Sequence, residues 1–326
     1  MTPDETAGQQ LEAAILGEDV VYNAVEVAAE TGATIEQAQR LWRALGFPDR
    51  GGERAFTQAD ADAVSTLLRL VDDDVIDFDM AVDLTRAVGQ TMARLADWEV
   101  GTLIHRVQEL ASDDDANGSR ATAALHLVEA LNQPFERLLV YVWRRHLAAA
   151  TARVEALGAD EADLHTTQVT VGFADIVQFT ALTNRLDHAR IGDLVEIFES
   201  RCADVVAGQR GRVIKSLGDA VLFVNEDPIR AYDTAEGIIA VIGRDQRMPD
   251  VRVGLSTGSV VTRLGDVFGP PVNLAARLTA VARRNRIIVD GTTAERLPQD
   301  QFEARALPPR PVRGFGVVEP VAVRRH

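Results

Sequence analysis

Two aspartates occupy positions that suit a divalent cation. Asp175 ends a run of alternating apolar residues that begins at Val169, a pattern typical of a strand, and a Phe-Thr pair that can open a helix follows it. Asp219 lies on a short Gly-containing turn between two further apolar runs. Carboxylates favour magnesium over zinc, and a helix N-terminus favours a phosphate chain. The two acids predict a magnesium-dependent phosphoryl site, although either one alone could be an ordinary surface residue.

Three further residues could serve the same site. The chain contains 33 arginines and a single lysine, Lys215, whose compact ammonium donates from one point whereas guanidinium is a planar fork. Asn273 and Arg277 are four residues apart, so a helix would place both on one face. Facing a phosphate, Arg277 would stabilise the charge that builds in a transition state. The alternatives are a stray lysine, and an Asn cap beside a solvated arginine.

The elements that would position these residues lie in the C-terminal half. From about residue 167, strand and helix patterns alternate, which predicts an α/β layer architecture. Lys215 lies in a hairpin that turns at Leu217-Gly218-Asp219, and Asn273 lies in a helix over 271–283. The other elements expected are strands over 168–175, 251–256, 259–264, 287–289, 302–306 and 317–323 and helices over 179–208 and 228–244.

The N-terminal half has a different pattern. Helical periodicity dominates residues 20–150, with few strand signals. Thr34 opens a capping-box pattern, and Thr57 starts another helix. Helices that flank a Gly turn could bind DNA, but the acidic surroundings argue against it. We expect an all-helical regulatory domain over 1–150, a linker over 151–166 and a second domain over 167–326.

Composition and charge narrow the function classes. The chain has 326 residues, 46% hydrophobic and 25% charged, which is enough for two cores. Its net charge of −15 argues against general affinity for nucleic acid or anionic membrane, since both need a basic field. The one cysteine, Cys202, excludes an intrachain disulfide and fits a reducing cytoplasm. There is no signal-peptide pattern and no apolar run long enough to span a bilayer, so we expect a cytoplasmic protein.

Four motifs together resemble the catalytic domain of class III nucleotidyl cyclases. They are F-A-D-I-V-x-F-T over 173–180, K-S-L-G-D over 215–219, G-D-x-F-G over 265–269 and V-N-x-A-A-R over 272–277. Their order and spacing match across roughly residues 167–323, about half of the chain. The resemblance implies an α/β (α+β) ferredoxin-like nucleotidyl cyclase catalytic domain, preceded by an all-α regulatory domain as in some soluble bacterial cyclases.

The resemblance also implies metal and base contacts. Asp175 and Asp219 would bind two Mg²⁺ or Mn²⁺ ions, with the Ile176 carbonyl assisting. Lys215 and Asp266 would select the base. Adenine offers an acceptor at N1 and a donor at N6, which suit a lysine donor and a carboxylate acceptor, whereas guanine offers the reverse. A mispaired buried polar group costs about 1–3 kcal/mol, so ATP is the expected substrate and cyclic AMP the product.

Contacts to the sugar and the phosphates are implied in the same way. Asn273 would orient the ribose, and Arg277 would support the phosphate at the transition state. Arg252, in V-R-V-G, matches a position that contacts the triphosphate. Arg313, in V-R-G-F, is a looser match to a basic phosphate ligand. The remaining substrate contacts are expected at Phe179 and Thr180.

These expectations describe an adenylate cyclase in which the ribose 3′-oxygen attacks the α-phosphorus and pyrophosphate leaves. In this family one catalytic domain supplies the metal acids and another supplies the base-selecting and Asn–Arg pairs, so a symmetric homodimer would hold two shared active sites. Gln178 stands where many relatives have Gly, which predicts slower turnover. The helical domain would regulate the catalytic pair and could respond to a small apolar signal or to pH, through His105, His126 and His146.

Two alternatives belong to other function classes. A diguanylate cyclase also has a Gly-Asp turn, but the run from Leu217 to Val221 lacks the second glycine and the following acid expected there. A non-catalytic nucleotide-binding signalling module is expected to have lost at least one of the residues that carry the chemistry. None of them is missing from this chain.

Overall fold

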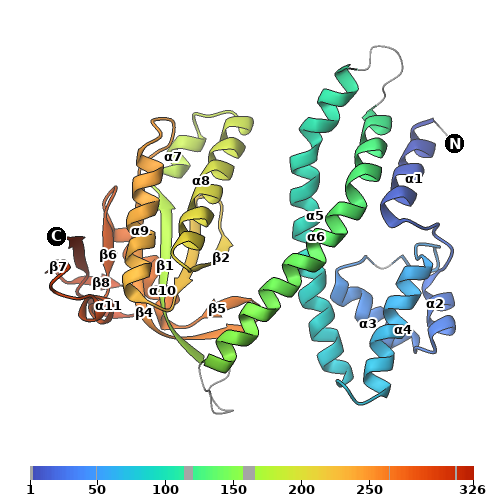
Figure 1. Ribbon diagram of the computed structural model, residues 1–326, viewed down its shortest axis with the longest axis horizontal. Helices are drawn as coiled ribbons and strands as arrows, with labels where there is room; N and C mark the ends of the chain where they lie inside the picture. The colour runs from blue at the N-terminus through green and yellow to red at the C-terminus, as the bar shows by residue number, and fades with distance from the viewer. Residues whose placement is uncertain (1–2, 49, 114–119, 157–165, 264, 313) are drawn as a thin grey trace. The chain divides into compact units, whose positions relative to one another are not determined.

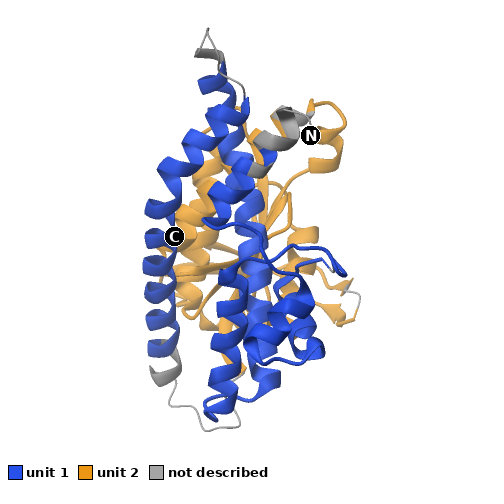
Figure 2. Ribbon diagram, turned by 90° about the vertical axis from the view of Figure 1, so that its right-hand side faces the viewer, with its two compact units in different colours: residues 1–153 blue, residues 154–326 orange. Residues whose placement is uncertain are grey.

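The computed structural model describes residues 3–48, 50–113, 120–156, 166–263, 265–312 and 314–326. The chain groups into two compact units, unit 1 over Met1–Arg153 and unit 2 over Val154–His326, which Figure 2 draws in different colours. All strands named among the described residues belong to unit 2. No helix in these residues is long and apolar enough to cross a membrane.

Unit 1 is helical, and its short helices begin at strong caps. Asn23, Thr34 and Thr57 each accept a backbone N–H bond in a capping box, which confirms the starts predicted at Thr34 and Thr57. A small core forms between the short helices, where Trp42 stacks on Phe56 with ring centroids 4.1 Å apart. The sequence patterns did not predict the first helix. The helices are α1 (Pro3–Leu16), α2 (Ala24–Thr31), α3 (Ile35–Leu45), α4 (Gln58–Asp72), α5 (Phe78–Asp113) and α6 (Arg120–Ala156).

Unit 2 is built on one mixed sheet (Figure 1). Its elements are β1 (Thr166–Ile176), α7 (Phe179–Thr183), α8 (His188–Gly208), β2 (Arg212–Ser216), β3 (Ala220–Asn225), α9 (Pro228–Gly243), β4 (Val251–Arg263), β5 (Asp266–Phe268), α10 (Pro270–Val281), β6 (Ile287–Val289), α11 (Gly291–Arg296), β7 (Phe302–Ala306), β8 (Arg310–Val312), β9 (Gly316–Val318) and β10 (Val321–Arg325). The strand order is β2-β3-β1-β4-β6-β10-β7, with β5 paired to β4. The run β1–α8–β2–β3–α9–β4 and its order β2-β3-β1-β4 are those of a ferredoxin-like fold, as predicted.

The sheet is buried on both faces, because alternate residues of its central strands enter different cores. From β1, Ala174 and Ile176 pack with α8 and α9, which lie side by side in Figure 1. Val171 and Phe173 pack with α10 in a separate core. Side chains of a strand alternate between its two faces, so Asp175 projects from the same face as Phe173. The candidate metal acid therefore lies on the face that α10 covers.

Two elements differ from the expected ones because of local breaks. The single helix expected over 179–208 is divided into α7 and α8, and the side chain of Asp187 caps the second of them. The strand expected over 317–323 is divided into β9 and β10 around Pro320, which has no N–H to continue a ladder.

Long-range pairing explains the other differences. The strands expected over 251–256 and 259–264 form one continuous strand, β4, because Gly258 still pairs with Val169 of β1. The three-residue strand β5 and the strand β8 also form by pairing, with β4 and β9 respectively. Strands as short as these have too few residues to show a period of their own.

The predicted linker over 151–166 lies largely outside the described residues. Helix α6 continues to Ala156 and β1 begins at Thr166, while residues 157–165 are not described. The boundaries given for the domains therefore stay a prediction.

Gly254 should be intolerant of a side chain, because a Cβ there would lie 2.4 Å from the backbone N of Thr279 and 2.5 Å from the Ala275 carbonyl oxygen, both in α10. We expect Gly254→Ala to force α10 off the sheet and to cost about 1–3 kcal/mol of stability. Gly192 in α8 has open space around it, so Gly192→Ala should be neutral or slightly stabilising. Urea unfolding of the two variants measures the difference, and equal midpoints would contradict it.

Candidate active site

Asp175 and Asp219 lie at neighbouring strand ends. Asp175 is the penultimate residue of β1, and its partner in β3 is Ala220, which follows Asp219 in the chain. The Ile176 N–H donates to the Asp219 carbonyl oxygen at 2.9 Å, which ties the two ends together. Gly218 has a φ of 77°, a left-handed value that glycine adopts freely in a tight turn. The two carboxylates are close enough for the charge of Asp219 to raise the pKa of Asp175.

Arg252 forms an ion pair with Asp175. It lies opposite Asp175 in the β1–β4 register, and its Nε and Nη2 atoms contact Asp175 Oδ2 at 2.7 and 2.6 Å. Its Nη1 atom donates to the Ala280 carbonyl oxygen near the end of α10 at 2.9 Å. Burial raises the pKa of Asp175 and the charge of Asp219 raises it further, whereas the Arg252 guanidinium lowers it. Burial is the strongest of these effects, so the pKa lies above that of an ordinary carboxyl group.

The donor set at these acids fits magnesium or manganese. Two half-buried carboxylates that repel each other gain from a divalent cation, and carboxylate oxygens are hard ligands. The described residues contain no group of three or more His, Cys, Asp or Glu side chains that could hold a metal by themselves. Further ligands would therefore come from backbone oxygens, such as the predicted Ile176 carbonyl, from water or from a phosphate chain.

Lys215 and Asp266 form an ion pair across 51 residues of sequence. Lys215 lies on β2 after an irregularity in its register with β3, and Asp266 begins β5. The Lys215 Nζ and Asp266 Oδ2 atoms are 2.5 Å apart, and both side chains are only partly exposed. Asp266 Oδ1 also accepts the N–H of Val267 at 2.8 Å. An ammonium has three protons and a carboxylate about four acceptor positions, so each partner keeps capacity for a further hydrogen bond.

Asn273 and Arg277 are exposed on α10, one turn apart on the same side of the helix. The helix is held from its other side, where Ala275 and Leu278 are buried. The hydroxyl of Thr279 donates to the Phe173 carbonyl oxygen of β1 at 3.2 Å, which anchors the helix to the sheet. The amide and the guanidinium therefore project from a fixed helix toward solvent.

The loop after β1 shows why glycine would suit the position of Gln178. That residue has φ 59° and ψ 33°, a left-handed conformation that costs a residue with a Cβ roughly 1 kcal/mol. Phe179 packs against the core under α8 and α9, so its ring supports the loop from inside, whereas Thr180 is exposed. Arg313 lies outside the described residues.

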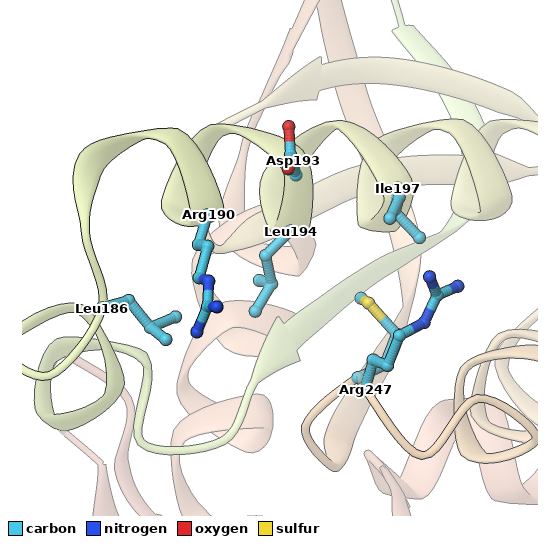
Figure 3. A pocket seen from close by; sticks show the side chains of 7 residues that line it. Leu186, Arg190, Asp193, Leu194, Ile197 and Arg247 are labelled. Atoms are coloured by element: carbon cyan, nitrogen blue, oxygen red, sulfur yellow. The ribbon is translucent and has the colours of Figure 1, made fainter.

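The cavity shown in Figure 3 lies elsewhere in unit 2 and has a volume of about 340 Å³. Arg190 and Leu194 of α8 point toward it, and Arg247 approaches from the loop before β4. None of the residues predicted for the site lines this cavity. The predicted site residues lie instead at the ends of β1 and β3, in the ion pair between β2 and β5, and on the exposed face of α10. The cavity is lined by Leu186, Arg190, Asp193, Leu194, Ile197, Arg247 and Met248.

The sequence patterns did not predict two features of the candidate site. The contact between Arg252 and Asp175 depends on the register of β1 with β4, which no local pattern reveals. Strand β5, which carries Asp266, is too short to be recognised by alternation. Alternation in β4 does place Arg252 and Gly254 on one face, but it does not identify the neighbouring strand.

The raised pKa of Asp175 predicts the sign of a pH effect. The folded protein keeps the Asp175 proton at pH values where the unfolded chain, with the ordinary value of 3.8, has lost it. The free energy of unfolding of wild type, relative to that of Asp175→Asn, should therefore fall as pH rises from about 4 through the raised pKa. Chemical unfolding in the presence of a chelator measures it.

Asp245 provides a control with the opposite sign. Hydrogen bonds from Arg247 hold the pKa of Asp245 well below its usual range, so its stabilising contribution is present above about pH 4 and is lost as pH falls. The difference between wild type and Asp245→Asn should therefore increase with pH. If the free-energy differences between wild type and Asp175→Asn and between wild type and Asp245→Asn both rose or both fell with pH, the directions given for the two pKa shifts would be wrong.

Comparisons with known proteins identify the family of this chain. The family model of the adenylate and guanylate cyclase catalytic domain matches residues 162–323. A protein named adenylate cyclase from Streptomyces coelicolor is 38% identical, over 97% of this chain and 89% of its own. One from Streptomyces griseus is 37% identical, over 99% and 90% respectively. A pH-sensitive adenylate cyclase from Mycobacterium tuberculosis is 30% identical, over 95% and 80%. The chain therefore belongs to the family of adenylate and guanylate cyclase catalytic domains, the class III nucleotidyl cyclases.

Proposed function

We propose that the protein is an adenylate cyclase, which converts ATP into 3′,5′-cyclic AMP and pyrophosphate. The relatives named adenylate cyclase match nearly the whole chain, which supports the activity. The lone Lys215, paired with Asp266, is the observation that supports the choice of base. The substrate and the single free cysteine also fit a cytoplasmic enzyme.

The base is selected by the hydrogen-bond donors of Lys215 and acceptors of Asp266 that their ion pair does not use. Lys215 can donate to adenine N1 while it remains bonded to Asp266, and Asp266 can accept from adenine N6. With guanine, the ammonium would meet the N1 donor and the carboxylate would meet the O6 acceptor. Each mispaired group costs about 1–3 kcal/mol, so we expect strong preference for ATP.

The remaining residues bind and orient the substrate for in-line attack. Asp175 and Asp219, with the Ile176 carbonyl, would hold two Mg²⁺ or Mn²⁺ ions, which when bound activate the attacking hydroxyl and neutralise phosphate charge. Asn273 holds the ribose so that its 3′-oxygen faces the α-phosphorus. Arg277 stabilises the negative charge that builds there.

Arg252 must change partners to reach the triphosphate. Its guanidinium is bonded to Asp175 in the structure, so a phosphate contact requires that bond to be given up. A cation at Asp175 would replace the positive charge that Arg252 withdraws. Thr180, Arg313 and the backbone of Phe179 would complete the phosphate and substrate contacts, because the Phe179 ring packs into the core. Gln178 would slow turnover by straining the loop.

The proposed activity is tested by the product formed from each nucleotide. Cyclic AMP should form from ATP with Mg²⁺ or Mn²⁺, and GTP should give at least tenfold less product, because two mispaired groups cost more than 1.4 kcal/mol. Asp219→Ala should lower the rate more than about a hundredfold, whereas Asp300→Ala, at an exposed turn, should not change it. Equal rates from both nucleotides, or an Asp219→Ala variant that remains active, would reject the proposal.

We further infer that two copies of the chain share two sites. The metal acids of one copy would act with the ion pair and the Asn273–Arg277 pair of the other, and a symmetric dimer repeats the arrangement twice. The exposure of Asn273 and Arg277 supports this, because their side chains have open space in which to meet a second copy.

Mixing two inactive variants tests the shared site. Asp219→Ala and Lys215→Ala homodimers should both be inactive, but half of the randomly mixed dimers are heterodimers with one intact site of two. The mixture should therefore recover about a quarter of the wild-type rate. Co-expression of the two variants lets heterodimers form without exchange of subunits between preformed homodimers. A mixture as inactive as its parents would show that each chain uses its own residues.

Unit 1 is proposed as the regulatory part. The relative named pH-sensitive matches 95% of this chain, which supports a role for pH, and the three histidines of this unit are exposed to solvent. A small apolar ligand is the other signal we consider. The assay above, repeated on residues 166–326, should give a changed rate or pH profile, and identical kinetics would remove the regulatory role.

A further inference from the structure

Segments that are far apart in the chain meet at Asp250, the residue before β4. Its carbonyl oxygen accepts the N–H of Val177, which directly follows β1, at 2.9 Å. Its carboxylate accepts a hydrogen bond from the side chain of Asn285, which lies shortly before β6, with Asn285 Nδ2 and Asp250 Oδ1 2.6 Å apart in partly buried surroundings. Asp250 therefore joins the loop after β1 to the loop before β6.

Asn285 is bonded to this region through both its backbone and its side chain. Its N–H donates to the Val251 carbonyl oxygen at 2.6 Å, and its Oδ1 atom accepts the Val251 N–H at 3.4 Å. Its φ of 53° is left-handed, a conformation that asparagine adopts more readily than most residues with a Cβ. Glycine would satisfy the backbone conformation, whereas the bond to Asp250 needs the asparagine side chain.

The Val177 N–H belongs to the same peptide unit as the Ile176 carbonyl. That unit is trans and close to planar, so its N–H and its C=O point in opposite directions. The N–H points to Asp250, on the β4 side of β1, so the carbonyl points to the other neighbour of β1, which is β3. A hydrogen bond that holds the N–H of Val177 therefore also sets the direction of the Ile176 carbonyl.

The β3 side of β1 is also the side of Asp219. The Ile176 N–H donates to the Asp219 carbonyl oxygen at 2.9 Å, and a strand residue presents its N–H and its C=O to the same neighbour. The Asp219 N–H, which would pair with the Ile176 carbonyl in a regular ladder, donates instead to the Leu217 carbonyl oxygen at 3.1 Å. The Ile176 carbonyl oxygen is thus directed toward the turn that carries Asp219 and keeps capacity for a cation.

We propose that Asn285 is a positioning residue for the metal site, and that it acts through Asp250 on the Ile176 carbonyl. The bond from Asn285 holds Asp250, and the Asp250 carbonyl oxygen holds the peptide unit whose own carbonyl faces Asp219. The inference deepens the proposed function and rests on it, because the site is the one at which Asp175 and Asp219 would bind Mg²⁺ or Mn²⁺.

The loop needs a tether at this point because the next residue is strained. Gln178 has a left-handed φ of 59°, which is unfavourable for a residue with a Cβ. Without the bond from Val177 to Asp250, the chain could relieve that conformation by rotating the peptide unit before it, and the Ile176 carbonyl would turn with the unit. A magnesium site tolerates such a change poorly, because Mg²⁺ demands near-ideal ligand geometry.

Asn285→Gly tests the side chain separately from the backbone conformation, because glycine adopts the left-handed φ and keeps the N–H that bonds Val251. Calorimetric titration of the full-length protein with 3′-deoxy-ATP, which lacks the attacking hydroxyl, gives one dissociation constant with Mn²⁺ and one with a chelator. Residues that orient a metal ligand typically change affinity about 10- to 100-fold when removed, so the constant with Mn²⁺ should rise about tenfold. The constant with chelator should not change. An unchanged constant with Mn²⁺ would overturn the proposal.

Arg284→Ala is the matched control, since Arg284 precedes Asn285 in the same loop. Its Nη1 atom lies 3.7 Å from Asp250 Oδ2, and 77% of its side chain is exposed. An exposed and loose ion pair contributes little, so both dissociation constants should equal those of wild type. If Arg284→Ala weakened binding with Mn²⁺ as much as Asn285→Gly, the charge near Asp250 rather than the Asn285 hydrogen bond would be responsible, and the proposal would be wrong.

Exchange of the two side chains provides a rescue. Asn285→Asp removes the donor and sets two carboxylates against each other, so binding with Mn²⁺ should weaken at least as much as in Asn285→Gly. Adding Asp250→Asn restores one donor and one acceptor with their positions exchanged, and should recover most of the affinity. A double variant that binds no better than Asn285→Asp would contradict the proposal. Because these exchanges hardly change side-chain volume, they also decide the question if Asn285→Gly does not fold.

Hydrogen exchange gives a readout that needs neither metal nor nucleotide. The Val177 amide should exchange several times faster in Asn285→Gly than in wild type, because its acceptor at Asp250 is no longer held. The Ile176 amide, which is bonded to Asp219, should keep its rate. Equal protection of the Val177 amide in the two proteins would show that Asn285 does not hold this peptide unit.

These measurements separate the inference from the proposed activity, because binding and exchange are read without formation of cyclic AMP. Weakened binding with Mn²⁺ in Asn285→Gly, in a protein that never forms cyclic AMP, would reject the activity alone. Unchanged binding in that variant, beside a wild type that forms cyclic AMP, would reject the inference alone. A wild type whose nucleotide binding does not respond to Mn²⁺ would reject both.

Discussion

The antiparallel pairing of β1 with β4 is the constraint on which unit 2 depends. Its register runs from Thr166 opposite Val261 to Ile176 opposite Val251. The two central strands are buried on both faces. One face contributes side chains to the core under α8 and α9, and the other face contributes to the core under α10. A shift of one residue would exchange the two faces of β1 and turn Asp175 away from α10. The position of Asp175 is therefore fixed by the same contacts that hold the domain together.

Two partly buried acids of the candidate site have ion-pair partners within the chain. Asp175 has Arg252, and Asp266 has Lys215. Partly buried charges need such partners, because an unpaired charge in these surroundings is costly. Under the proposed mechanism, binding of a metal nucleotide would exchange the partner of Arg252 and add hydrogen bonds at the ion pair.

The two units bury their apolar side chains to different degrees. Unit 2 encloses fully buried side chains such as Phe198 and Phe223. Unit 1 has a small core around Trp42 and two long helices whose aromatic side chains, including Trp143, remain in solvent. Exposed apolar side chains of this kind gain free energy when other protein surface covers them.

The sequence alone determined the types of residue and their local elements, because alternation, helical period and caps act over a few neighbours. Asp175 at a strand end, the Lys215 hairpin, the α10 residues Asn273 and Arg277 and the cap at Thr57 were all recognisable in this way. Tertiary structure alone decided the register that pairs Arg252 with Asp175, the short strand that brings Asp266 to Lys215 and the break before α8. These depend on contacts between residues far apart in the chain, whose free energy is gained only when the whole sheet is assembled.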